Sequence, residues 1–301
     1  MHSDSIHRVS WRVAHLWDCF KLAFLPLKCL NCGSLFQSQS VEMINAKYPP
    51  STRSVTGKIL GTDLHRRNFQ TMAPATLFTQ VMAEHLCPVC AHQFRPTKTP
   101  YCVRCGLMFV SREGRDHVCG ECLESHFFFG MARSVGVYDQ ALMAVIHRFK
   151  YRHRVNLARP LSLLLLHTYC RFWHEHPMDM VVPVPLFRHR FRERGFNQAY
   201  LLLRPWKDPN WQQALPGPPA ICRDILERRR QTTPQTGLGR QDRKRNVSKA
   251  FYLKNGDLIK DKKILLIDDV YTTGATVNEC ARIIMQAGAE QVDVLTLARA
   301  I

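Results

Sequence analysis

The sequence predicts an α/β protein in which a mostly parallel sheet with flanking helices follows a small cysteine-rich domain. Two observations support this class. Helix and strand patterns alternate through the second half of the 301 residues, as expected for parallel strands joined by crossover helices. In the first half, cysteines recur in closely spaced pairs, of which the last ends at Cys122. This change of texture places the domain boundary near residue 126.

The amino-terminal residues predict an amphipathic helix. Val9, Val13, Leu16 and Phe20 recur at helical spacing over residues 4–25, and Pro26 ends the pattern. We assign residues 1–28 to this segment, which by default packs on the core and alternatively lies on a membrane surface. No export signal or transmembrane segment is predicted, because the apolar run at 161–166 is shorter than the roughly 20 residues that a bilayer requires. We therefore expect a cytoplasmic protein.

Eight of the twelve cysteines form four CxxC pairs. Two pairs supply four thiolates, enough for one tetrahedral zinc site, so a double zinc ribbon with about two structural zinc ions is expected over residues 29–126. Gly33 and Gly106 suit the tight turns of such sites. A redox role is the alternative, but no thioredoxin-like surroundings follow. The spacing leaves the pairing open among Cys29, Cys32, Cys87, Cys90, Cys102, Cys105, Cys119 and Cys122.

Residues 38–73 interrupt this domain. They are poor in aliphatic and rich in polar residues, which predicts a disordered insert before a short helix over residues 75–86. His174 and His176 lack a metal-binding pattern and are expected at the surface. The remaining cysteines are expected to be buried small apolar groups: Cys19, Cys170, Cys222 and Cys280.

Residues 127–301 supply the sheet. Helical patterns cover residues 140–150, 157–173 and 197–206, and strand patterns cover 179–186, 262–269 and 292–299. The apolar run at 264–267 is typical of a central parallel strand with both faces buried. After the turn that follows, Thr276 and Glu279 have the spacing of a capping box, and Gly288 ends the helix.

Asp268 and Asp269 stand together at the end of that strand, before a turn of hydroxyls around Gly274. Open α/β sheets bind ligands at the carboxyl ends of their strands. The amides of a glycine turn at a helix amino terminus suit a phosphate, and paired carboxylates accept hydrogen bonds from sugar hydroxyls. The pattern predicts a sugar-phosphate site. Other phosphate motifs are excluded, since no GxxxxGK[ST] occurs and GLGRQD at 237–242 lacks the third glycine of the dinucleotide fingerprint.

The stretch ILLIDDVYTTGAT at 264–276 resembles the phosphoribosyl diphosphate motif of type I phosphoribosyltransferases, with Tyr271 replacing a usual aliphatic residue. With VVPVPLFRHRFRERGFNQAY, RRRQTTPQTGLGRQDRKRNVSKAF and the cysteine pairs, it makes the chain similar to ComF family proteins over residues 1–37 and 75–301. That family joins a double zinc ribbon to a type I phosphoribosyltransferase-like domain and includes competence and DNA-utilisation proteins. The resemblance implies such a domain over residues 127–301.

The resemblance also implies residue roles. Asp268 and Asp269 would hold the ribose hydroxyls as the catalytic pair, and Arg188 and Arg190 would lie near the diphosphate. Mg²⁺ would accompany the diphosphate, because it prefers phosphate oxygens to a cage of protein ligands. Residues 227–250 would form a mobile hood over the site. The 5-phosphate would be wrapped by Thr272, Thr273, Gly274, Ala275 and Thr276.

A net charge of +18 predicts attraction to polyanions, with a solvated basic surface as the alternative. Basic and aromatic residues mix at 147–154 and 188–196, as in proteins that bind single-stranded nucleic acid, although the same residues could serve the diphosphate and the core. In the hood, the candidate nucleic-acid contacts are Arg228, Arg229, Arg230, Arg243, Lys244 and Arg245.

Two functions are therefore expected. In the first, the protein binds phosphoribosyl diphosphate and single-stranded DNA and serves DNA uptake, with competence proteins as partners. In the second, it is an enzyme that moves phosphoribosyl onto a nitrogen acceptor. An acceptor pocket distinguishes the two, and the sequence has no recognisable glutaminase nucleophile or base-reading signature, which favours the first.

Overall fold

The computed structural model describes residues 26–37, 69–111, 113–152, 154–213, 215–230 and 249–301. The predicted amino-terminal helix, Cys19, most of the predicted insert and the hood residues Arg243, Lys244 and Arg245 lie outside these ranges. The end of the insert is described: Phe69 is fully buried, and the carbonyl of Met72 accepts a hydrogen bond from His167 Nε2 at 2.9 Å.

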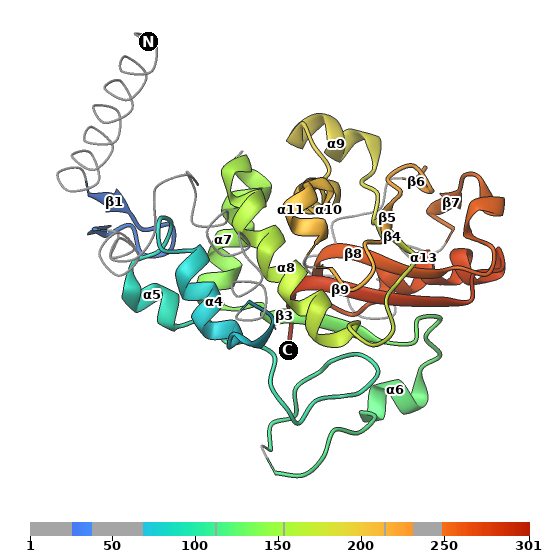
Figure 1. The fold of residues 1–301 in the computed structure, drawn as a ribbon, viewed down its shortest axis with the longest axis horizontal. Coiled ribbons are helices and arrows are strands. Elements are labelled where there is room, and N and C mark those ends of the chain that lie inside the picture. The colour runs from blue at the N-terminus through green and yellow to red at the C-terminus, as the bar shows by residue number, and fades with distance from the viewer. Residues whose placement is uncertain (1–25, 38–68, 112, 153, 214, 231–248) are drawn as a thin grey trace, which may run out of the picture.

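Five parallel strands form the central sheet, as the α/β class predicts (Figure 1). β8 is central, and its residues Ile264 and Ile267 are fully buried, which fits a strand covered on both faces. β8 runs past the predicted end and pairs with β9 as far as Tyr271. In sheet order the strands are β3 (Ala132–Val137), β9 (Gln291–Arg299), β8 (Lys263–Tyr271), β4 (Met180–Pro183) and β5 (Ala220–Ile221).

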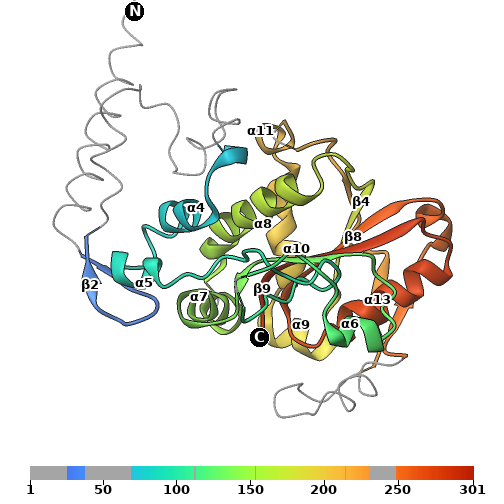
Figure 2. The same ribbon diagram turned by 90° about the horizontal axis from the view of Figure 1, so that it is seen from below.

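Successive side chains of the strands enter different hydrophobic clusters, because side chains alternate between the faces of a sheet. Leu265 and Ile267 pack with the helices α7 (Gln140–Tyr151), α8 (Ala158–Phe172) and α10 (Gln198–Leu203). Ile264 and Leu266 pack with α13 (Ala275–Gln286) and with the hairpin of β6 (Leu226–Arg228) and β7 (Phe251–Leu253). Figure 2 shows α8 and α13 on opposite sides of the sheet.

Most predicted helices are present. α7 and α8 lie where the patterns place them, whereas α4 (Pro74–Val81) ends five residues before the predicted end at residue 86. The predicted helix at 197–206 is divided into α10 and the 3-10 turn η3 (Arg204–Lys207), which contains Pro205. The sequence did not predict α9 (Arg188–Arg194), whose only large apolar residue is Phe191. The other described elements are short: β1 (Leu27–Lys28), β2 (Leu35–Phe36), α5 (Pro88–His92), α6 (Gly120–Glu124), α11 (Pro209–Gln212), η2 (Val155–Leu157) and η4 (Gly256–Ile259).

The predicted capping box at Thr276 and Glu279 is wrong. α13 begins at Ala275, and Gly274 occupies the N-cap position in the left-handed region with φ 74°, with no capping side chain in the described part of the chain. Glu279 instead accepts a hydrogen bond from the Lys249 amide at 2.8 Å and pairs with Arg282. The first amides of α13 are therefore left to other partners.

The cysteine-bearing segments pack continuously with the sheet across residue 126. The Val137 amide donates to Arg95 O at 2.8 Å and the Ala132 amide to Arg104 O at 2.7 Å, so residues 95–104 run beside β3. Cys29 shares a hydrophobic cluster with α7 and α8, and Cys102 shares the other with α13. Among the described residues, no helix is long and apolar enough to cross a membrane.

Candidate functional site

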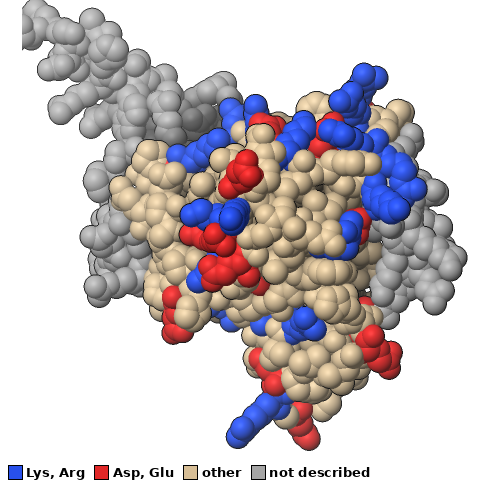
Figure 3. Space-filling model, turned by 90° about the vertical axis from the view of Figure 1, so that its right-hand side faces the viewer, with Lys and Arg blue, Asp and Glu red and all other residues tan. Residues whose placement is uncertain are grey.

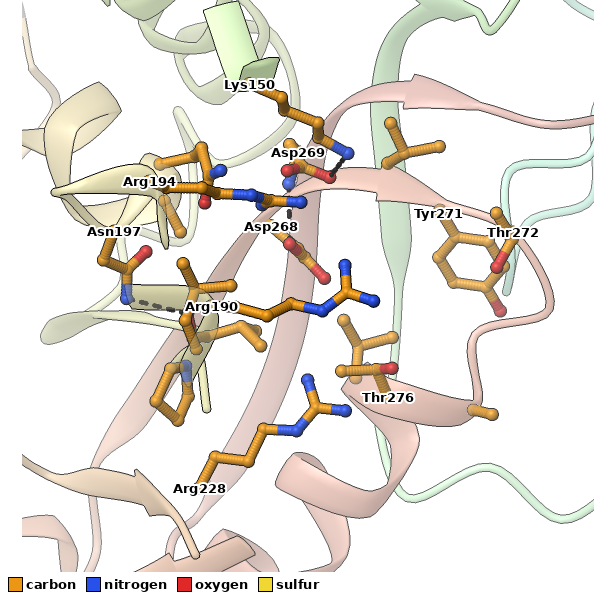
Figure 4. Close-up of a pocket in the computed structure, with 18 of the residues that line it drawn as sticks. Lys150, Arg190, Arg194, Asn197, Arg228, Asp268, Asp269, Tyr271, Thr272 and Thr276 are labelled. Carbon is orange, nitrogen blue, oxygen red and sulfur yellow. Dashed lines mark hydrogen bonds and ion pairs between the residues drawn. The ribbon is translucent and has the colours of Figure 1, made fainter. Parts of the chain in front are cut away.

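A cavity of about 580 Å³ opens at the carboxyl ends of β8 and β4, the edge that the sequence pattern singles out (Figure 4). Its walls come from the β8–α13 turn, from α7, and from the segment that carries α9 and α10. Seven of the residues predicted to bind phosphoribosyl diphosphate line it, and so does Arg228, which was predicted to contact nucleic acid. The seven are Asp268, Asp269, Thr272, Gly274, Ala275, Thr276 and Arg190.

The two aspartates lie in different environments. Asp269 forms a 2.7 Å ion pair with Lys150 of α7, and both side chains are largely buried. Burial disfavours the Lys150 ammonium, but the charge and hydrogen bond of Asp269 outweigh it, so the pKa of Lys150 is raised. Asp268 has no such partner among the described residues and accepts one hydrogen bond, from the Asp269 amide at 2.8 Å. Lys150 thus neutralises the charge of Asp269, whereas Asp268 has no cation at ion-pair distance among the described residues.

Asp268 resists ionisation. Burial, followed by the charge of Asp269, raises the pKa of Asp268 to about 7. A ligand that donates hydrogen bonds to this carboxylate, or brings a cation to it, would relieve that cost. Sugar hydroxyls and a metal-bound ligand both meet this requirement.

The raised pKa of Asp268 makes stability depend on pH. The unfolded carboxyl ionises near pH 4 and the folded one near pH 7, so the ligand-free protein should lose stability as the pH rises between these values. Asp268→Asn should remove this loss, which amounts to at most about 4 kcal/mol at about 1.4 kcal/mol per pKa unit. Urea unfolding of both proteins at pH 5 and pH 8 should show about 3 kcal/mol of it, because the loss has already begun below pH 5. Asp224→Asn, outside the cavity, is the control, and parallel pH profiles of wild type and Asp268→Asn would contradict the prediction.

The turn at 272–276 presents backbone amides to the cavity. Gly274 can hold its left-handed conformation without a side-chain penalty, and a Cβ there would collide with the Tyr271 ring. Because no described side chain caps α13, the amides of its first turn face the cavity edge with the positive end of the helix dipole. Thr273 lies in the turn but does not line the cavity, and its buried hydroxyl has no partner among the described residues.

Basic side chains surround the aspartates (Figure 4). Arg190 of α9 and Arg228 of β6 lie on the side of Thr276, and Arg194 approaches from the opposite side. Asn197 holds this wall in place, because its Nδ2 donates to Val184 O at 3.1 Å and its Oδ1 accepts from the Tyr200 amide. The cavity therefore combines three guanidinium groups with two carboxylates and a helix amino terminus, a composition that suits a hydroxylated anion.

Other predicted residues lie elsewhere. The Arg188 side chain is 79% exposed and pairs with Glu227 outside the cavity. Of the hood arginines, Arg228 lines the cavity, whereas Arg229 and Arg230 are exposed. Arg229 lies over the Tyr252 ring at 4.6 Å.

Sequence reasoning missed several lining residues. Lys150, His147 and Tyr151 of α7 face the cavity, although the sequence placed them only in a basic cluster. Their spacing of three and four residues puts them on one helix face and could have identified them. No sequence pattern indicated Arg194 and Gln198. They reach the cavity because of the positions of α9 and α10 and of the bend between these helices.

The eight paired cysteines form two clusters, and the structure settles their pairing. Cys29, Cys32, Cys87 and Cys90 form the first cluster, and Cys102, Cys105, Cys119 and Cys122 form the second. Within each, all sulfur atoms lie within 4.8 Å of one another. Gly33 and Gly106 have φ of 77° and 71°, as their turns require.

The geometry of both clusters fits a tetrahedral metal site. Zinc–sulfur bonds of about 2.3 Å place sulfur atoms about 3.8 Å apart, and the Sγ distances are 3.7 Å for Cys105–Cys119 and 3.8 Å for Cys32–Cys87. Burial raises the pKa of Cys90 to about 12 and that of Cys105 to about 11. A bound cation would replace these protons and stabilise the thiolates.

The cysteines outside the CxxC pairs and the two predicted surface histidines lie away from these clusters. Cys170 and Cys280 are buried as predicted, and Cys222 is half-buried. His174 and His176 are exposed, as predicted.

Arg299, at the end of β9, connects the second cluster to the cavity turn. Its Nη2 donates to Cys105 Sγ at 3.3 Å, and its guanidinium lies 4.3 Å from the centre of the Tyr271 ring. Tyr271 in turn fills the space under Gly274. Cluster, arginine and turn thus form one continuous set of contacts.

Comparisons with known proteins agree with this architecture. Residues 221–301 match the phosphoribosyl transferase domain. The chain is 32% identical over 225 residues to Competence protein F of Haemophilus influenzae, covering 71% of this chain and 90% of that protein. It is 33% identical over 222 residues to DNA utilization protein YhgH of Escherichia coli, with the same coverage of 71% and 90%. It is 26% identical over 231 residues to Competence protein ComFC of Bacillus subtilis, covering 74% and 88%.

These matches confirm the phosphoribosyltransferase-like sheet and the resemblance on which it was predicted. The parallel sheet carries the carboxylate pair and glycine turn inside the matched domain, and the cysteine clusters precede or adjoin it. The chain therefore belongs to the family of competence protein F and DNA utilization protein YhgH, the ComF family, and carries a phosphoribosyl transferase domain at its carboxyl end.

Proposed function

We propose that the protein binds phosphoribosyl diphosphate in the cavity and single-stranded DNA on its basic surface, and serves DNA uptake. The observation that carries the first part is the carboxylate pair beside an uncapped helix amino terminus in an arginine-lined cavity. The names of the relatives, which refer to competence and DNA utilization, support the second.

The cavity suggests where each part of the ligand lies. The amides at 272–276 hold the 5-phosphate, as helix amino termini do in other phosphate sites. Asp268 accepts hydrogen bonds from the ribose hydroxyls, which relieves the cost of its ionisation. Arg190 and Arg228, which lie together near Thr276 in Figure 4, neutralise the diphosphate.

Two metals belong to this proposal. Zinc occupies both cysteine clusters as a structural ion, because four thiolates at tetrahedral spacing leave no open coordination position. Mg²⁺ enters with the diphosphate, since it prefers phosphate oxygens. Among the described residues, the cysteine clusters are the only groups of three or more potential metal ligands, so no magnesium cage is found in that part of the chain.

Calorimetric titration with phosphoribosyl diphosphate and Mg²⁺ tests the first part of the proposal. Saturable binding that requires Mg²⁺ supports it. A protein that binds neither the diphosphate ester nor inorganic phosphate contradicts it.

Exposed basic and aromatic side chains support binding of single-stranded DNA. Phe191 and Tyr252 are 49% and 44% exposed, and each lies near exposed arginines of α9 or β6. Arg223 lies 5.6 Å from the centre of the Tyr200 ring. Figure 3 shows Lys and Arg gathered along the upper edge of one face, with acidic groups interspersed. Such surfaces bind nucleic acid by phosphate pairing and base stacking.

The salt dependence of DNA binding tests the second part. Changing Arg229 and Arg230 to alanine together should reduce the slope of log affinity against log salt by about 1.4, at about 0.7 per single-strand phosphate contact. Arg228 is excluded from this variant because it lines the cavity. Fluorescence anisotropy with labelled single-stranded DNA measures the slope, and phosphoribosyl diphosphate binding should be unchanged. Identical slopes for wild type and variant, or no DNA binding at low salt, would show that Arg229 and Arg230 do not contact DNA.

The cavity also favours a second candidate, transfer of phosphoribosyl to a nitrogen acceptor. Beyond the aspartates it extends to Tyr138, His147 and Tyr151, which the phosphoribosyl group does not need. An acceptor there would attack the anomeric carbon with a nitrogen lone pair. The carbon–oxygen bond would break with its electrons passing to the diphosphate, which would also take the proton lost by the nitrogen.

A further inference from the structure

We infer that the far part of the cavity, bounded by Tyr138, His147, Tyr151, Arg194 and Gln198 and called here the acceptor lobe, binds a planar compound with an acidic group, such as an aromatic carboxylate. This inference rests on the proposed function, in which phosphoribosyl diphosphate fills the remainder of the cavity. Three observations on the acceptor lobe support it.

Aromatic rings form one wall of the acceptor lobe. The rings of Tyr138 and His147 lie 6.3 Å apart at 28°, and those of His147 and Tyr151 lie 5.6 Å apart at 54°. All three residues line the cavity. Aromatic walls favour planar ligands, which pack on ring faces and edges. A diphosphate, which has no apolar face, gains little from such a wall.

Arg194 places a positive charge beside this wall. The residue is only 6% exposed, its Nη2 donates to the Tyr151 hydroxyl at 3.2 Å, and its guanidinium lies 4.9 Å from the centre of the Tyr151 ring. Within the described ranges no carboxylate lies at ion-pair distance from Arg194, in contrast to Lys150, which Asp269 neutralises. Figure 4 shows Arg194 extending into the cavity. A buried cation of this kind favours an anionic ligand.

Two buried donors in the acceptor lobe have no partner. Arg194 Nε and Gln198 Nε2 find no acceptor among the residues that the structure describes, and Gln198 is 1% exposed. Buried polar groups are nearly always hydrogen-bonded, and each exception costs stability. A carboxylate can accept from both kinds of donor. Both side chains line the cavity although these two nitrogens are covered, so a small shift of either side chain would bring an unsatisfied donor to the acidic group of a ligand.

The diphosphate fits the other side of the cavity better. Arg190 and Arg228 lie near Thr276, across the aspartates from Arg194 (Figure 4). Two guanidinium groups close to the phosphate turn suit a polyphosphate chain. The acceptor lobe is thus left for a different anion.

Binding of benzoate and benzamide tests the inference, because the two differ in charge and hardly in shape. Ligand-observed NMR titration should show benzoate binding about ten-fold or more tightly than benzamide, since hydrogen bonds to a charged group are the stronger kind. Arg194→Gln should remove the preference and Arg194→Lys should retain part of it. Arg192→Gln, on an exposed position of the same helix, is the matched control and should leave it unchanged.

Several results would overturn the inference: no benzoate binding, equal binding of the two probes, or a preference that Arg194→Gln leaves intact. Displacement of benzoate by magnesium diphosphate alone would also overturn it, because the acceptor lobe would then be the diphosphate subsite. The protein could bind benzoate in a way that depends on Arg194 and yet fail to bind phosphoribosyl diphosphate. That result would support the inference and contradict the proposed function. The two failures are therefore distinguishable.

Discussion

Removal of metal by a strong chelator should lower the unfolding temperature of the protein by at least about 20 °C. Structural zinc contributes on the order of 10 kcal/mol per site, two sites are expected, and each kcal/mol shifts the unfolding temperature of a chain this large by about 1.5 °C. The cysteines of each cluster pack in the same hydrophobic core as helices that flank the sheet. Loss of metal should therefore also destabilise the part of the protein after residue 126. Scanning calorimetry before and after chelation measures it, and elemental analysis should find about two zinc ions per chain.

Single cysteine variants separate the two clusters. Cys32→Ser and Cys105→Ser should each reduce the metal content to about one ion, because three thiolates hold zinc poorly in a closed site. Cys222→Ser, a half-buried cysteine outside both clusters, is the control. A metal-free protein with the unfolding temperature of the purified one would show that the clusters are not structural zinc sites.

Replacement of Asp268 and Asp269 by asparagine together should abolish binding of phosphoribosyl diphosphate. Wild-type protein should gain about 2.7 kcal/mol of stability at a ligand concentration one hundred times the dissociation constant, and the double variant should gain none. Asparagine keeps the size of each side chain and an oxygen for the Asp269 amide, so circular dichroism should be unchanged. Thermal shifts with ligand and Mg²⁺ measure the difference.

The two single variants should differ in the absence of ligand. Asp269→Asn leaves the Lys150 ammonium without its anion, which destabilises the folded protein. Asp268→Asn leaves that ion pair intact, so its loss of ligand binding reports on the site alone. Asp224→Asn should bind as wild type does. Equal ligand stabilisation of wild type and double variant would exclude these carboxylates from the site.

The sheet was predictable because burial dictates its sequence. A strand covered on both faces must be continuously apolar, and the run at 264–267 has that property. The turn was predictable for a similar reason, since Gly274 adopts a backbone conformation that other residues avoid. Both features depend on a short stretch of the chain, so the residues of that stretch are enough to predict them.

The walls of the cavity were less predictable because they depend on tertiary placement. α9 carries six charged or imidazole side chains around Phe191, so hydrophobic periodicity does not reveal it. Nothing in the spacing shows that Arg188 points outward to Glu227 while Arg190 and Arg194 reach the cavity. Even the cap of α13 was misread, because Glu279 finds Lys249 and Arg282 instead of the helix start.

The contacts of Arg299 would let the proposed metal site and the cavity affect each other. Its guanidinium touches Cys105 Sγ of the second cysteine cluster and the ring of Tyr271 under the glycine turn of the cavity. Thermodynamic linkage makes any coupling through such a contact reciprocal: a metal that tightens ligand binding by some factor is itself held tighter by the same factor when the ligand is bound. Scarcity of metal in the cell would then be felt at the cavity, and abundant ligand would help the chain retain its metal.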